Sequence, residues 1–161
     1  MFDTTHLHPM IVHFPIALLI VGFLFDLISL FSRKELFSTV GLYLLILGTL
    51  GVIAAFFSGN FAGDGISEAG SLKQALETHE GAAEIALWLM IAAAVLRIAF
   101  VWMKRYSGVY KYVAIGIFLL GVLAIARTGY YGGELVFKHA AGVQFNVGLD
   151  SNSGTSSDEK E

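Results

Sequence analysis

Four long apolar runs dominate the pattern of this chain. They cover residues 10–31, 36–58, 82–103 and 109–131, and each contains 22 or 23 residues. A helix needs ~20 residues to cross ~30 Å of hydrocarbon, so every run is long enough to span a membrane. Membrane-spanning strands would alternate polar and apolar side chains, and these runs do not. The pattern therefore predicts an all-α integral membrane protein with four transmembrane helices.

The segments between the runs predict how the helices are arranged. Residues 32–35 and 104–108 are short turns, and short connections join antiparallel neighbours. Residues 59–81 form a longer connection whose second half is polar and helix-prone, so the third helix is expected to begin before its apolar run. Residues 144–161 are rich in Ser, Gly and acidic side chains and cannot bury a core. We expect an antiparallel four-helix bundle over residues 1–143, followed by a disordered polar tail.

Composition narrows the class of protein. Hydrophobic residues make up 56% of the 161 positions and charged residues 14%, against roughly 25% charged residues in an ordinary soluble domain. The net charge of -3 gives no electrostatic reason to expect nucleic acid as a partner. The absence of cysteine excludes disulfides, thiolate metal sites, iron–sulfur clusters and covalently attached haem. No basic segment precedes the first apolar run, so we expect this run to be retained rather than removed as a signal peptide.

The basic residues predict the orientation of the bundle. Most of them flank the two short turns, and few lie on the opposite side. The first group is Arg33, Lys34, Lys104, Arg105 and Lys111, and the second is Lys73, Lys138 and Lys160. Since basic residues are retained in the cytoplasm, the short turns are expected inside and both termini outside.

All five histidines fall at the predicted outer face. They are His6, His8, His13, His79 and His139. A polar ring within an apolar run, such as that of His13, needs a partner or a function. Haem b requires axial imidazoles and cations for its propionates. We therefore expect His13 and His79 as axial ligands, His8 and His139 as supporting or alternative ligands, and Arg127 beside a propionate.

Two other interpretations fit the same histidines. Zinc or copper could be bound by His13 and His79 with nearby carboxylates, which gives a metal-binding protein without redox chemistry. The histidines could also line an interface of a structural or accessory subunit without a cofactor. No nucleophile-elbow serine and no evident pair of catalytic carboxylates occurs, so an electron carrier or redox subunit is favoured over a stand-alone enzyme.

Asp26 and Arg97 are expected to form a structural ion pair. Both lie about two-thirds of the way down their apolar runs, counted from the outside. An uncompensated charge at such a depth costs ~2.5–3.5 kcal/mol or more. Arg97 follows His79 by 18 residues, which is five helical turns, so these two share a face. Asp26 follows His13 by 13 residues, about 140° around the helix, so these two face different neighbours.

Two motifs identify a resemblance. The first apolar run opens with HPMIVHFPIA at residues 8–17, and the last helix closes with GGELVFKH at residues 132–139. The chain resembles, over residues 1–143, the bacterial membrane family known as domain of unknown function 2231, including the positions of Asp26, His79 and Arg97.

The resemblance implies a four-helix domain of the bacterial cytoplasmic membrane, in a family whose members are sometimes fused or adjacent to redox proteins. Combined with the histidines, it leads us to expect a small b-type, cytochrome-like electron-transfer subunit surrounded by lipid. An external redox partner or quinone would exchange electrons with it. A homo-oligomer is compatible with this expectation.

Overall fold

The computed structural model describes residues 7–32, 34–63 and 70–141, and this part of the chain contains four α-helices and no strand. The helices are α1 (Leu7–Phe31), α2 (Glu35–Gly63), α3 (Ser71–Trp102) and α4 (Gly108–His139). Each is long and apolar enough to cross a membrane, as the four apolar runs predict. The predicted tail at 144–161 and His6 lie outside the described residues.

The helices extend beyond the apolar runs. The third helix begins at Ser71, before its apolar run, as expected, and the fourth continues beyond residue 131 to His139. An apolar run marks only the part of a helix that needs hydrocarbon around it, whereas backbone hydrogen bonding continues through polar residues in water. At the end of α4, Ala140 adopts a left-handed conformation, and its N–H donates to the carbonyl of Val136.

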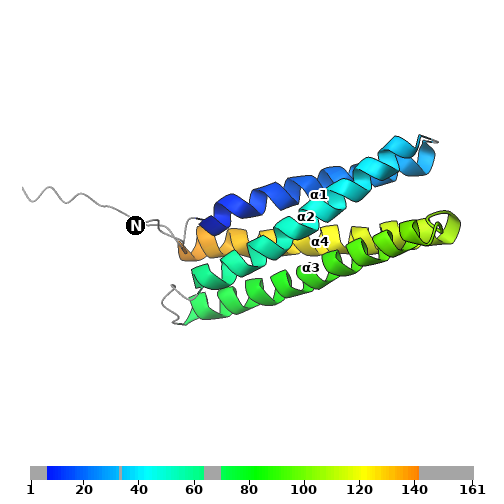
Figure 1. Ribbon diagram of the computed structural model, residues 1–161. Coiled ribbons are helices and arrows are strands. Elements are labelled where there is room, and N and C mark those ends of the chain that lie inside the picture. Colours follow the sequence, from blue (N-terminus) through cyan, green and yellow to red (C-terminus); the bar gives the residue numbers. More distant parts are fainter. Residues whose placement is uncertain (1–6, 33, 64–69, 142–161) are drawn as a thin grey trace, which may run out of the picture.

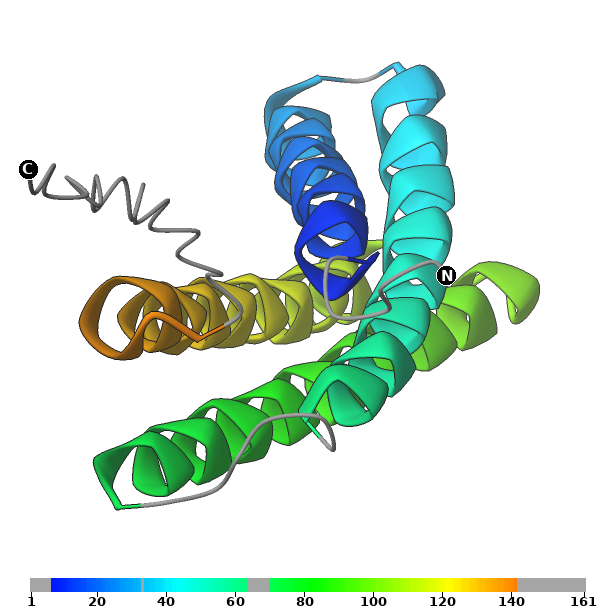
Figure 2. The ribbon, with the colours of Figure 1, turned by 90° about the vertical axis from the view of Figure 1, so that its left-hand side faces the viewer.

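The helices form two hairpins that pack against each other (Figures 1 and 2). The α1–α2 and α3–α4 pairs make the most extensive contacts, α2–α3 makes fewer, and α1–α4 makes the fewest. Within the described residues, the backbones of α1 and α3 do not contact each other, and neither do those of α2 and α4. These two pairs therefore lie on the diagonals of the bundle, whose outer surface carries many exposed apolar side chains.

In the diagonal helices α1 and α3, the residues that face the bundle interior follow one another at the same intervals. Successive steps of seven, four, three and four residues recur in both, as in a coiled-coil seam. The set in α1 is His8, Pro15, Leu19, Gly22 and Asp26, and the set in α3 is His79, Ala86, Met90, Ala93 and Arg97. Each member of the first set thus has a counterpart 71 residues later in the sequence.

Helices α2 and α4 repeat in the same way, with a shift of 73 residues. Gly48 of α2 faces Leu19, because a Cβ atom added to that glycine would lie 2.5 Å from Leu19 Cγ. Gly121 of α4 faces Met90 in the same manner, at 2.5 Å from Met90 Cε. The two hairpins are therefore an internal repeat, related by a pseudo-two-fold axis along the bundle.

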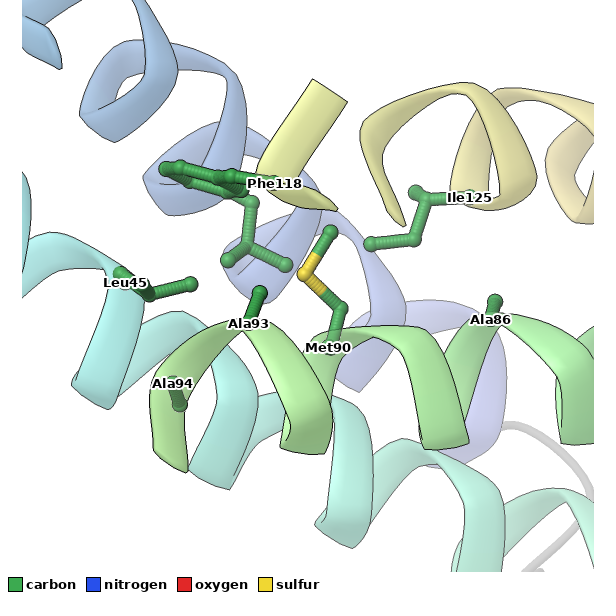
Figure 3. Close-up of a cluster of buried hydrophobic side chains, with 8 residues drawn as sticks. Leu45, Ala86, Met90, Ala93, Ala94, Phe118 and Ile125 are labelled. Atoms are coloured by element: carbon green, nitrogen blue, oxygen red, sulfur yellow. The ribbon is translucent and has the colours of Figure 1, made fainter. Parts of the chain in front are cut away.

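Large apolar side chains fill the middle of the bundle. Leu19, Leu45, Met90 and Phe118 come from the four different helices, and each is at most 1% exposed. Figure 3 shows Met90 extending from α3 toward α4, between Phe118 and Ile125. This apolar core separates the end of the bundle that contains His8 from the end that contains Arg97.

Candidate functional site: a paired histidine layer

The side chains of His8 and His79 meet across the diagonal between α1 and α3. Their ring centroids are 6.3 Å apart, and the ring planes are nearly perpendicular, at 82°. Both rings are half-buried. His8 lies in the first turn of α1, which begins at Leu7. Pro9 is compatible with this start, since a proline is tolerated in the first turn of a helix.

Each ring is held through its Nδ1 atom by a neighbouring helix of the same hairpin. His8 Nδ1 lies 3.0 Å from the carbonyl oxygen of Ala55 and 3.0 Å from Ser58 Oγ. His79 Nδ1 lies 3.2 Å from the carbonyl oxygen of Thr128. Since a carbonyl can only accept, these contacts assign the proton to Nδ1 in both rings.

The remaining ring nitrogen is available in both histidines. Among the described residues, neither Nε2 atom has a hydrogen-bond partner. A neutral imidazole whose Nδ1–H is bonded to a backbone carbonyl presents its Nε2 lone pair, and this is the form in which histidine binds metal ions. The two histidines are therefore prepared as ligands in the same way.

Two glycines complete this layer of the bundle. A Cβ atom on Gly59 of α2 would lie 3.0 Å from His8 Cε1, and one on Gly132 of α4 would lie 3.2 Å from His79 Cε1. Any side chain at these positions would press on the imidazoles. We call His8, His79, Gly59 and Gly132 the paired histidine layer, with histidines on one diagonal and glycines on the other.

The structure does not bring His13 to this layer. His13 is exposed, and its Nδ1 donates to the carbonyl oxygen of Pro9 at 2.6 Å. The expected pairing of His13 with His79 is therefore corrected to His8 with His79. The reason is angular, because His13 follows His8 by five residues and lies about 140° from it around the helix.

His139 and Arg127 lie at the same end of the bundle but outside the layer. His139 is the last residue of α4 and borders a cleft of about 270 Å³ between the beginning of α3 and the end of α4. Arg127 is exposed, with its guanidinium carbon 5.4 Å from the centre of the Tyr131 ring. The structure therefore gives both residues surroundings of their own, separate from the paired imidazoles.

The described residues contain no group of three or more His, Cys, Asp or Glu side chains that could hold a metal ion. A bare zinc or copper ion takes three or four protein ligands, and the pair of imidazoles supplies two. Haem needs no more than two protein ligands, because its macrocycle already provides the other nitrogens. The two imidazoles of the layer can thus supply two ligands to a metal centre.

The ion pair between Asp26 and Arg97 lies on the same diagonal as the histidines. Arg97 Nη1 is 2.5 Å from Asp26 Oδ2, and the two side chains are 2% and 0% exposed. Arg97 Nη2 also donates to the carbonyl oxygen of Ser38 at 2.7 Å. Each charge is therefore compensated at the depth at which the sequence places it.

The chain matches a known family of membrane proteins. A family model described as a predicted membrane protein (DUF2231) matches residues 4–145. No curated protein and no solved structure matches this chain. The match covers all four helices and the whole paired histidine layer.

Proposed function

The chain belongs to the DUF2231 family of predicted membrane proteins, and we propose that it is a small b-type haem protein that transfers electrons, with His8 and His79 as the ligands of the iron. One observation carries the proposal. Two half-buried imidazoles from diagonal helices lie together, each with Nδ1 bonded to a backbone carbonyl and Nε2 unpartnered among the described residues.

The separation of the two rings supports two ligands to one metal centre. The ring centroids are 6.3 Å apart, so the two imidazoles are close enough to bind one metal centre together. The internal repeat makes the two imidazoles equivalent, which suits a metal centre that would take one imidazole from each hairpin. Gly59 and Gly132 allow the two rings to lie close to the backbones of α2 and α4.

Bound haem supplies a one-electron redox centre, and the chain's own residues bind and orient it. The carbonyl groups of Ala55 and Thr128 fix the ring orientations and keep the protons on Nδ1. Arg127 is assigned to a propionate, since it is the cation nearest in sequence to Thr128 on α4. His139, at the same end of the bundle, has a supporting role at the haem site. His13 is not a ligand in this proposal.

We place the protein in the bacterial cytoplasmic membrane as an antiparallel bundle, with the histidine layer and both termini on the external side. The exposed cations Lys34, Lys104 and Arg105 at the opposite end favour that end as the cytoplasmic one. An external redox protein or a quinone would then exchange electrons with the layer. Lateral contact between two copies of the bundle is compatible with this arrangement.

The test is the absorption spectrum of the full chain, expressed with ample haem and purified in mild detergent. We expect a reduced-minus-oxidised spectrum of low-spin haem, and haem that extracts into acidified organic solvent because no cysteine binds it covalently. His8→Ala and His79→Ala should each abolish the low-spin spectrum. His13→Ala is the matched control, since it removes an exposed imidazole from the same helix and should leave the spectrum intact.

Two outcomes would contradict the proposal. Colourless wild-type protein that carries stoichiometric zinc or copper, lost in His8→Ala, would replace haem by a metal ion. Colourless protein without metal would leave a structural or accessory role for the bundle.

A further inference from the structure

A second polar cluster lies at the opposite end of the bundle and carries more positive than negative charge. Asp26, Arg97 and Lys111 supply two cations and one carboxylate. Lys111 Nζ donates to the carbonyl oxygen of Ser29 at 2.6 Å, one turn of α1 beyond Asp26. Tyr106 covers Arg97, with the guanidinium carbon 3.9 Å from its ring centre. We call these five residues the Arg97 cluster.

All buried side-chain polar atoms without a hydrogen-bond partner in the described part of the chain belong to this cluster. They are Asp26 Oδ1, Arg97 Nε and Tyr106 Oη. Arg97 is 1% exposed, so its unpaired Nε–H is fully desolvated. Burial raises the pKa of Tyr106, so its hydroxyl keeps its proton and can donate. The cluster thus has a surplus positive charge and two unused donors, Arg97 Nε and Tyr106 Oη, against one unused acceptor, Asp26 Oδ1. This balance favours an anionic ligand.

The Lys111 side of the cluster lies close to the ends of its two helices. Lys111 is the fourth residue of α4, and Ser29 comes two residues before the end of α1. At 1.5 Å per residue, both are within ~5 Å of their helix ends. Lys111 bridges α4 to α1, and this interface is the least extensive of the four between neighbouring helices. A headgroup can therefore approach Lys111 from the surrounding lipid.

The internal repeat shows that this surplus cation is specific to one edge. The counterpart of Lys111 in the first hairpin is Ser38, at the interface between α2 and α3. There, Arg97 Nη2 donates to the carbonyl oxygen and to Oγ of Ser38. The cation at that edge, Arg97, is therefore already hydrogen-bonded. Among the residues that the structure describes, the α1–α4 edge alone places an additional cation beside the cluster.

We propose that the Arg97 cluster binds the phosphate group of an anionic phospholipid at the α1–α4 edge. Lys111 would be its charged donor, and the unpaired hydroxyl of Tyr106, which lies over Arg97, its second donor. The exposed cations Lys34 and Lys104 at this end outnumber Glu35 and attract the same charge. The site is independent of haem, because it lies beyond the apolar core from the paired histidine layer.

The test measures thermal unfolding of the full chain after delipidation in a neutral detergent. Phosphatidylglycerol, phosphatidylcholine or inorganic phosphate is added, and the shift of the midpoint is compared. A ligand that binds only the folded state raises the midpoint. Phosphatidylglycerol should raise it by several degrees more than phosphatidylcholine, and inorganic phosphate should have little effect.

Variants then locate the site. Lys111→Gln should lose most of the shift produced by phosphatidylglycerol, whereas Arg105→Gln, which removes an exposed cation from the same end, should retain it. Tyr106→Phe keeps the ring over Arg97 and should raise the half-saturating lipid concentration several-fold. This variant decides the matter if Lys111→Gln does not fold.

Three results would overturn the proposal. Equal shifts with the two lipids would mean that no anionic group is selected. Equal losses in Lys111→Gln and Arg105→Gln, or an unaffected Tyr106→Phe, would mean that the attraction is diffuse surface charge. An equal shift with inorganic phosphate would mean a free-anion site instead of a lipid site.

Discussion

Asp26 follows His8 by 18 residues on α1, and the two side chains therefore lie on the same face of the helix, five turns apart. His79 and Arg97 have the same separation on α3. The two diagonal helices thus meet twice, through imidazoles at one end and through the ion pair at the other. A slip of α1 against α3 would break both contacts, so the ion pair helps to hold the imidazoles opposite each other.

The first prediction concerns this ion pair. Asp26→Asn or Arg97→Leu alone should destabilise the folded protein by about 3–5 kcal/mol, because each leaves one buried charge without its partner. The double variant should recover part of the loss. Thermal or denaturant unfolding of the purified variants measures the cycle. Purely additive losses would contradict a direct coupling between the two side chains.

The second prediction compares the equivalent glycines Gly48 and Gly121. Gly48→Ala forces the branched carbon of Leu19 to move, whereas Gly121→Ala meets the terminal methyl of Met90, which can rotate away. We expect a cost of roughly 1–3 kcal/mol for Gly48→Ala and a smaller one for Gly121→Ala. Gly116→Ala is the control on α4, since its Cβ would meet no atom within 4 Å. A larger loss at Gly121 than at Gly48 would contradict the packing described.

The third prediction tests the glycines of the paired histidine layer. Gly59→Ala should displace the ring of His8, and Gly132→Ala that of His79, since the added Cβ atoms would lie 3.0 and 3.2 Å from ring atoms. Both variants should bind haem more weakly or with an altered low-spin spectrum. Gly129→Ala, where the added atom would meet nothing within 4 Å, should match the wild-type spectrum. Unchanged spectra in all three would separate the glycines from the cofactor.

The fourth prediction concerns orientation. A reporter fused after Glu161 should read as external, and one inserted after Ser107 should read as cytoplasmic. Replacing Lys34, Lys104 and Arg105 together by neutral residues should weaken this orientation, because these exposed cations carry much of the charge bias. Reporter signals of the opposite sign at both positions would invert the bundle and move the histidine layer to the cytoplasmic side.

The sequence predicted the ion pair through depth alone. Charged side chains in hydrocarbon pair with one another, so two opposite charges at the same level of two apolar runs indicate a contact. Asp26 and Arg97 form this contact. The sequence did not predict the partner of His79. Starting the first helix at residue 10 left His8 outside it, although Pro9 is acceptable in a first turn and α1 in fact begins at Leu7.

The equal spacing in α1 and α3 was the signal that would have found His8. His79 and Arg97 are 18 residues apart. Asp26, the acidic residue of the first apolar run, lies at the same distance from His8. Periodicity of apolar residues did not reveal it, because transmembrane helices are apolar on every side and show no amphipathic face. The spacing of polar residues in the interior, rather than the apolar pattern, indicates how the helices of such a bundle align.

The dry middle of the bundle has an electrical consequence. Leu19, Leu45, Met90 and Phe118 close the interior between the two polar ends with side chains at most 1% exposed. Ions and protons gain no hydrated passage through such a plug, so the protein insulates one aqueous compartment from the other. A reaction at His8 and His79 that draws its electrons and protons from one compartment moves no charge across the membrane voltage. Its equilibrium is therefore independent of whether the membrane is energised.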